Sequence, residues 1–162
     1  MLAEERILLT GASGYIGGRL QPVLERAGRR VRCLARRPES LSARAAAATE
    51  VVAGDLLAAE ALAPAMEDIH TAYYLVHSMG DVSDFARSER QAAERFAHVA
   101  KASGLRKIVY LGGLGGDDAA STHLRSRHEV GRILRASGGP TLEFRASIGI
   151  GSGRLSFEMV RG

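Results

Sequence analysis

The sequence has a single cysteine, no tryptophan and no long hydrophobic run. With only Cys33, no intrachain disulfide can form, and this favours a reducing compartment and a buried core thiol. No apolar stretch approaches the roughly 20 residues that a membrane-spanning helix needs. The first six residues, MLAEER, lack the apolar core of a secretory signal. We therefore expect a cytoplasmic protein with no membrane partner.

The charge of the chain does not indicate a nucleic-acid partner. There are 22 basic and 18 acidic residues, which leaves a net charge of +4. Nearly all the basic residues are arginines, and they are spread along the chain rather than gathered in one block. Such a pattern is typical of a solvated surface, so nucleic-acid binding is not expected. With 162 residues, the chain has the length of one domain with a sizeable core.

Short apolar runs alternate with longer segments of helical period. Strands are expected at residues 6–9, 31–35, 51–53, 72–76, 107–111 and 141–144, and helices at 15–26, 58–66, 84–103 and 123–137. Such alternation, with short connections, predicts a parallel sheet that is covered by helices on both faces. The expected fold class is α/β, a doubly wound sheet of strand order 3-2-1-4-5-6, as in the Rossmann fold.

Glycines are concentrated between the first expected strand and the first helix, in LLTGASGYIGGRL. Gly11, Gly14 and Gly17 form the pattern G-x-x-G-x-x-G at a strand-to-helix turn. Backbone N–H groups and the positive helix end there form an anion site, and the missing side chains let a pyrophosphate approach. The predicted dinucleotide-binding residues of this turn are Gly11, Ser13, Gly14, Tyr15, Ile16 and Gly17. The alternative is a purely structural tight turn, and Gly18 is expected to serve helix-to-sheet packing.

The choice of dinucleotide depends on the residue that ends the second strand. A carboxylate about 20 residues beyond the glycines would bind the ribose 2′-hydroxyl of NAD. Here Arg36 and Arg37 stand at that place, and guanidinium groups suit a 2′-phosphate. We therefore predict NADP as the cofactor, with NAD as the alternative if Glu39 binds the ribose. The two arginines could also be ordinary solvated loop residues.

Several motifs resemble those of the atypical and extended short-chain dehydrogenase/reductases, which include NmrA-like proteins and sugar-nucleotide epimerase relatives. They are TGASGYIG, ARRP after the second strand, GDL at 54–56, YYLVHSM at 73–79 and HLRSRHEVG at 123–131. The resemblance implies that Asp55 contacts the adenine amino group with Leu56 beside it, and that Val76, His77 and Ser78 border the ribose. From the residues alone, Asp55 is equally typical of a turn, and His77 of a strand end.

The catalytic pattern of that superfamily is not preserved. Its enzymes use a Tyr-x-x-x-Lys pair on the fifth helix and a serine or threonine that ends strand five. The matching positions here hold His123 and Arg127, and glycines 112 and 113 replace the hydroxyl residue. A histidine can transfer protons near neutral pH, and an arginine can bind a ribose or phosphate, so His123 and Arg127 are the catalytic candidates, with His128 second. Two surface histidines are the alternative.

The resemblance leaves two functions open. One is the NAD(P)(H)-binding domain of an oxidoreductase or epimerase-like enzyme, which acts on a small molecule that the sequence does not identify. The other is a non-catalytic NADP sensor or assembly subunit. We expect residues 1–150 to form the Rossmann domain and 151–162 to begin a truncated substrate lobe, whose absence would expose apolar surface suited to a homodimer. Asp117 and Asp118 lie in a glycine-rich loop without other ligand spacing, so no metal is expected.

Overall fold

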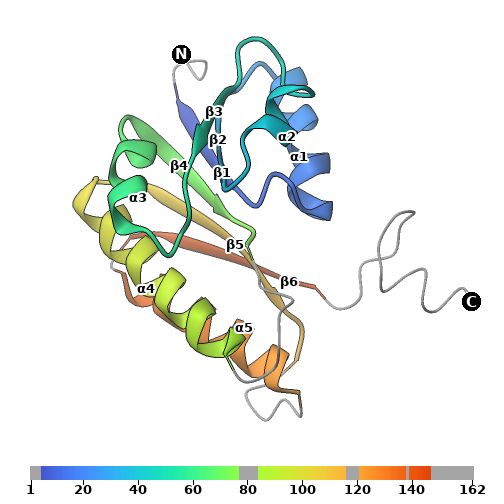
Figure 1. The fold of residues 1–162 in the computed structure, drawn as a ribbon. Coiled ribbons are helices and arrows are strands. Elements are labelled where there is room, and N and C mark those ends of the chain that lie inside the picture. Colours follow the sequence, from blue (N-terminus) through green and yellow to red (C-terminus); the bar gives the residue numbers. More distant parts are fainter. Residues whose placement is uncertain (1–4, 77–83, 116–120, 138, 147–162) are drawn as a thin grey trace, which may run out of the picture.

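A computed structural model describes residues 5–76, 84–115, 121–137 and 139–146 of the chain, which form a parallel sheet with helices on both faces (Figure 1). The strands are β1 (Arg6–Thr10), β2 (Arg30–Ala35), β3 (Glu50–Ala53), β4 (Ile69–Tyr74), β5 (Lys107–Gly113) and β6 (Thr141–Ala146). The helices are α1 (Tyr15–Arg26), α2 (Glu39–Ser42), α3 (Ala59–Met66), α4 (Phe85–Ala102) and α5 (Thr122–Ala136).

The strand order is β3-β2-β1-β4-β5-β6, and every pair of neighbours is parallel, as predicted. β1 lies in the middle, where Leu9 is opposite Cys33 of β2 on one side and Tyr73 of β4 on the other. The chain therefore leaves β1 toward one edge of the sheet and returns at β4 to build the other. In an open α/β sheet, the crevice outside the carboxyl ends of the strands at this reversal is where ligands bind.

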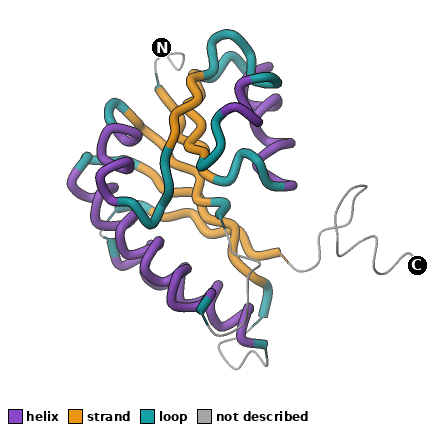
Figure 2. The backbone as a smooth tube through the Cα atoms, viewed as in Figure 1, coloured by secondary structure: helices purple, strands orange, loops and turns teal. Residues whose placement is uncertain are grey.

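Two apolar cores hold the layers together. Figure 2 shows helices on both sides of the sheet, and Figure 1 places α1 and α2 on one face and α3, α4 and α5 on the other. The core under α1 and α2 contains Ile7, Leu9, Ala12, Leu24, Val31, Cys33, Ala35 and Leu41. The larger core under α3, α4 and α5 is centred on aromatic contacts, with the Tyr74 ring edge-on to Phe96 at 4.9 Å between centroids. Both faces of the central strands are thus buried, which is why their sequences are rich in apolar residues.

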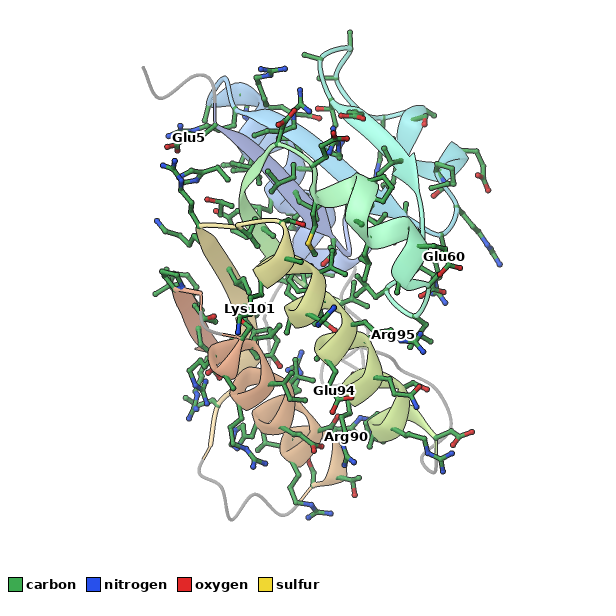
Figure 3. All side chains as sticks on the ribbon, turned by 90° about the vertical axis from the view of Figure 1, so that its left-hand side faces the viewer. Glu5, Glu60, Arg90, Glu94, Arg95 and Lys101 are labelled. Atoms are coloured by element: carbon green, nitrogen blue, oxygen red, sulfur yellow. The ribbon has the colours of Figure 1, made fainter. Side chains whose placement is uncertain are left out.

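The α4 helix illustrates how the sequence pattern sets the outer surface. Its inner stripe is buried, and its exposed face carries charges of both signs at Arg90, Glu94, Arg95 and Lys101 (Figure 3). Within the described ranges, none of the helices combines the length and the apolarity that crossing a bilayer requires.

β5 and β6 each extend two residues beyond the predicted end, and two other elements differ more from expectation. β4 was expected at residues 72–76 but spans Ile69–Tyr74, because Ile69 pairs with Arg6 and buries its side chain although polar His70 and Thr71 follow it. The one-turn helix α2 was not expected from the sequence. It is closed by a hydrogen bond from the Ser42 hydroxyl to the carbonyl of Pro38, at 2.9 Å.

Candidate functional site

The glycine turn joins β1 to α1 at the carboxyl edge of the sheet. Gly11 has a φ of +74°, a conformation that side chains disfavour, and a Cβ there would lie 2.9 Å from the carbonyl group of Leu75. The adjacent Thr10 hydroxyl donates to the carbonyl of Tyr73 at 2.9 Å, which fixes the end of β1 against β4. The first glycine therefore lets the turn lie directly on the β4 backbone.

The third glycine is required by packing. Gly17 is buried in the first turn of α1, and a Cβ on it would overlap the carbonyl group of Gly11. The start of the helix consequently rests on the backbone of the turn itself. This contact orients the α1 axis toward the crevice.

Gly14 differs from both, because the fold gives little reason for its missing side chain. Its φ of −77° and ψ of 174° suit any residue, and within the described chain a Cβ would meet only the Gly11 oxygen, at 3.2 Å. Gly14 is the N-cap of α1 without a capping side chain, and the first turn of the helix holds no acid. Such an N-terminus presents backbone N–H groups and a positive dipole to a ligand. The turn therefore fits the pyrophosphate of a dinucleotide.

The other predicted residues of the turn surround this N-terminus. Ser13 is exposed, and Ile16 is half-buried. The Tyr15 ring is covered by the guanidinium of Arg19, which lies 3.7 Å from the ring centroid. These three residues remain predicted ligand contacts.

Arg36 and Arg37 follow the last residue of β2, at the same edge of the sheet, and both side chains are exposed. Glu39, the acid that would favour NAD, is the first residue of α2 and is also exposed. The Ser40 hydroxyl donates to the carbonyl of Arg37 at 2.9 Å, which holds the loop that carries the arginines against α2. The loop therefore presents two cations beside the end of β2.

Asp55 and Leu56 follow β3. The Asp55 carboxylate accepts from the backbone N–H of Leu57 at 3.0 Å, so it forms a turn, one of the two roles considered for it. The Leu56 side chain is buried in the larger core and not directed to the crevice surface. Contact of Asp55 with adenine stays a prediction. His77 and Ser78 lie outside the described residues, and Val76 before them is exposed.

His123 lies in the first turn of α5, at the carboxyl end of β5. The helix is capped by Ser121, whose hydroxyl accepts from the N–H of Leu124 at 3.1 Å. The His123 imidazole is exposed and stacks on the ring of Phe85, the first residue of α4, with 4.3 Å between centroids and 21° between planes. Because Phe85 is buried, this contact fixes the plane of the imidazole. His123 is thus a held, solvent-accessible ring.

Arg127 lies one turn after His123 and is half-buried. Its main-chain carbonyl accepts from the Tyr110 hydroxyl at 2.8 Å, which attaches α5 to β5. The structure therefore places the two catalytic candidates on one helix, close to the end of β5.

The place of the missing hydroxyl residue is filled by packing. Gly112 and Gly113 are the last residues of β5. A Cβ on Gly112 would lie 2.5 Å from the Glu143 carboxylate, and a Cβ on Gly113 would overlap the Leu124 side chain. A serine or threonine at either position would need the end of the neighbouring flexible side chain to shift.

The tyrosines of the neighbouring strands do not replace the missing acid. Tyr74 and Tyr110 lie in the larger core, and burial raises the pKa of both hydroxyls, with Tyr110 and Glu89 adding to the effect on Tyr74. His128, the second histidine candidate, is buried, and its Nε2 lies 3.2 Å from the carbonyl oxygen of Gly113. It serves the contact between α5 and β5.

Among the described residues, no three His, Cys, Asp or Glu side chains gather as a metal site would need, and Asp117 and Asp118 lie outside them.

Two residues near the site were not predicted from the sequence. Phe85 supports the His123 ring, and Arg44 reaches the glycine turn, where its Nη2 donates to the carbonyl of Ala12 at 2.7 Å. Neither has a sequence signal, because each acts through a residue that is distant in the chain.

Cys33 is buried as predicted. Its burial raises the pKa of its thiol to about 12, with Glu25 also raising that pKa and Arg44 lowering it.

Solved structures resemble this fold. Triphenylmethane reductase of Citrobacter sp., crystallised with NADP(H), aligns over 88% of this chain and 50% of its own, with 20% identity and a TM-score of 0.76. The NADPH-dependent quinone oxidoreductase of Escherichia coli, complexed with NADPH, aligns over 86% of this chain and 48% of its own, with 23% identity and a TM-score of 0.72. The Bordetella bronchiseptica enzyme WbmH, complexed with NAD+, aligns over 97% and 62%, with 18% identity and a TM-score of 0.78.

This chain therefore spans between about half and three fifths of the length of these structures. At such identities the similarity shows the fold, the Rossmann fold with its strand order 3-2-1-4-5-6. No curated protein sequence matches the chain. The sequence pattern of the NAD(P)H-binding family matches residues 11–144, which begin at the first glycine of the turn and end in β6. The chain belongs to the NAD(P)H-binding family.

Proposed function

We propose that this chain is the NADP(H)-binding domain of an atypical short-chain reductase or epimerase-like oxidoreductase. The observation that carries the proposal is Gly14, a glycine that its backbone conformation does not require and whose Cβ would have a single tight contact, 3.2 Å from the Gly11 oxygen. An N-terminus of a helix that lacks both a side-chain cap and an acid is suited to an external anion. The family match over residues 11–144 supports the pyrophosphate of NAD(P)H as that anion.

The preference for NADP rests on Arg36 and Arg37. Both are exposed cations directly after β2, at the edge where the adenosine ribose lies in this fold. A guanidinium can donate two hydrogen bonds to a phosphate, whereas the hydroxyl of NAD needs an acceptor. Glu39 is displaced from the strand end into α2, which makes it a weaker candidate for that acceptor.

We further propose that His123 is the group that transfers a proton to or from the substrate. The nicotinamide of the bound cofactor would supply the hydride. The imidazole is exposed and oriented by Phe85, and an imidazole can donate and accept protons near neutral pH. Arg127, one turn further along α5, supplies a permanent cation for a ribose or phosphate oxygen.

The sheet face beside β6 supports the proposed domain organisation. On the side of α1 and α2, Leu142 and Phe144 are 49% and 55% exposed, and Leu114 beyond β5 is 58% exposed. Such a patch is suited to a further lobe that begins at residues 151–162, or to a second copy of the chain as a homodimer. We propose a cytoplasmic enzyme with a small-molecule substrate.

The test has two arms. Fluorescence titration of the protein with NADPH and NADH is expected to show binding of both, with NADPH tighter by about tenfold, the effect of one charge-assisted hydrogen bond. Equal or tighter NADH binding would contradict the role of the arginines. In the full-length protein, hydride transfer from NADPH to a carbonyl substrate is then expected. Tight NADPH binding without turnover on any carbonyl in a broad panel would instead indicate a non-catalytic NADP sensor.

A further inference from the structure

Arg44 connects the loop after β2 to the glycine turn. It follows α2, and its guanidinium Nη2 donates to the carbonyl of Ala12 at 2.7 Å. The guanidinium lies against α1 at the position where Gly18 has no side chain, because a Cβ there would be 3.5 Å from both terminal nitrogens. The fourth glycine of the turn, expected to serve helix-to-sheet packing, therefore faces this arginine.

The bond determines the orientation of one peptide group in the turn. The Ala12–Ser13 peptide is planar and trans, so its carbonyl oxygen and the N–H of Ser13 point in opposite directions. A cation that holds the Ala12 oxygen on one side fixes the direction of the Ser13 N–H on the other. The next N–H, that of Gly14, already donates to the Gly11 oxygen at 2.9 Å. The Ser13 N–H is consequently the donor of the turn whose direction depends on Arg44.

The charge of Arg44 is directed to this turn and not to a neighbouring acid. Within the described ranges, Arg44 makes no ion pair, and its hydrogen bond goes to the Ala12 carbonyl. Hydrogen bonds from an ionised donor are stronger than neutral ones. Such a bond also polarises the peptide and makes its N–H a better donor to an anion.

We propose that Arg44 is a positioning residue of the dinucleotide site, which holds the Ala12–Ser13 peptide in the orientation that binds the cofactor. The inference rests on the proposed function and deepens it. Arg36 and Arg37 distinguish NADP from NAD at the 2′-position. Arg44 acts on the backbone cradle, which both dinucleotides use, so its effect is the same for both.

The experiment compares Arg44→Ala, Arg44→Lys and the control Arg95→Ala. Arg95 is an exposed arginine on α4, on the opposite face of the sheet (Figure 3). We expect Arg44→Ala to weaken NADPH and NADH by the same factor, about tenfold, as for one charged hydrogen bond. Arg44→Lys should restore most of the affinity, since an ammonium also donates to a carbonyl. Arg95→Ala should bind both dinucleotides as the unmodified protein does.

A second measurement needs no ligand. Hydrogen exchange, followed by mass spectrometry, is expected to be faster in the peptide that covers residues 11–18 of Arg44→Ala, and unchanged in Arg95→Ala. Unchanged affinities in Arg44→Ala would overturn the proposal, and so would a loss confined to NADPH, which would make Arg44 a 2′-phosphate ligand. If the unmodified protein binds neither dinucleotide, the proposed function is wrong. If the hydrogen exchange of residues 11–18 is also unchanged in Arg44→Ala, then Arg44 does not hold the Ala12–Ser13 peptide either.

Discussion

Gly14 and Gly17 stand three positions apart in one turn, yet substitution should affect them in opposite ways. Gly14→Val is expected to leave the fold intact, because the backbone of Gly14 is extended and a Cβ has a single tight contact, 3.2 Å from the Gly11 oxygen. Loss of a glycine N-cap costs about 1 kcal/mol or less of unfolding free energy. The branched side chain would occupy the pyrophosphate position and separate the phosphates from at least one N–H group. One charged hydrogen bond is worth about 1.5–3 kcal/mol, so affinity should fall by about 10- to 100-fold or more.

Gly17→Ala is the matched comparison. Its Cβ would overlap the carbonyl group of Gly11, which is backbone and cannot rotate away. Overpacking of this kind costs about 1–3 kcal/mol, which in a chain of this size lowers the Tm by about 2–12 °C. The Tm of Gly14→Val, in contrast, should stay within a few degrees of the unmodified protein, as about 1 kcal/mol implies.

The assays are thermal unfolding followed by circular dichroism and calorimetric titration with NADPH. Calorimetry is performed well below the lowest Tm, so that each variant is folded. A folded Gly14→Val protein that binds NADPH with unchanged affinity would refute the cradle. A Gly14→Val protein as destabilised as Gly17→Ala would show that Gly14 is there for packing.

Three further predictions concern single side chains. Arg36→Asp should reverse the cofactor preference in a fluorescence titration, because the new carboxylate accepts from the ribose hydroxyls and repels a 2′-phosphate; a variant that still prefers NADPH would exclude Arg36 from the 2′-pocket. His123→Ala in the full-length protein should reduce turnover by about 100-fold with unchanged cofactor affinity, and unchanged turnover would place the proton transfer elsewhere. Cys33 should resist thiol reagents at pH 8 in the native protein and react once unfolded, because burial raises its pKa from 9.0 to about 12 and lowers the thiolate fraction by roughly 1,000-fold; rapid native labelling would contradict that burial. For the same reason, the thiol's contribution to stability is complete below its unfolded pKa and is lost as the pH rises toward about 12.

Much of the fold could be predicted from local sequence patterns. Buried parallel strands are rich in apolar residues, and helices follow a 3.6-residue period. The six strands, the four longer helices and the strand order 3-2-1-4-5-6 were therefore predicted correctly. The glycine turn was also predictable, since its three glycines are adjacent in the chain and stand between a strand and a helix. The predicted start of β4 was wrong. Ile69 is buried by its pairing with β1, and this pairing depends on a strand that is distant in the chain.

The sequence pattern does not say why each glycine is present, and only the tertiary structure separates their roles. Gly11 avoids the backbone of Leu75, Gly17 avoids Gly11, and Gly18 faces Arg44, whereas the backbone conformation of Gly14 suits any residue. Arg44 and Phe85 were not predicted because their partners, Ala12 and His123, are far away in the chain. The sequence by itself determined most of the elements and the presence of a glycine-rich turn between β1 and α1, because both are encoded by neighbouring residues. The tertiary structure decided which side chains hold that turn and orient His123, because those contacts exist only after β1, β4, α2, α4 and α5 have come together.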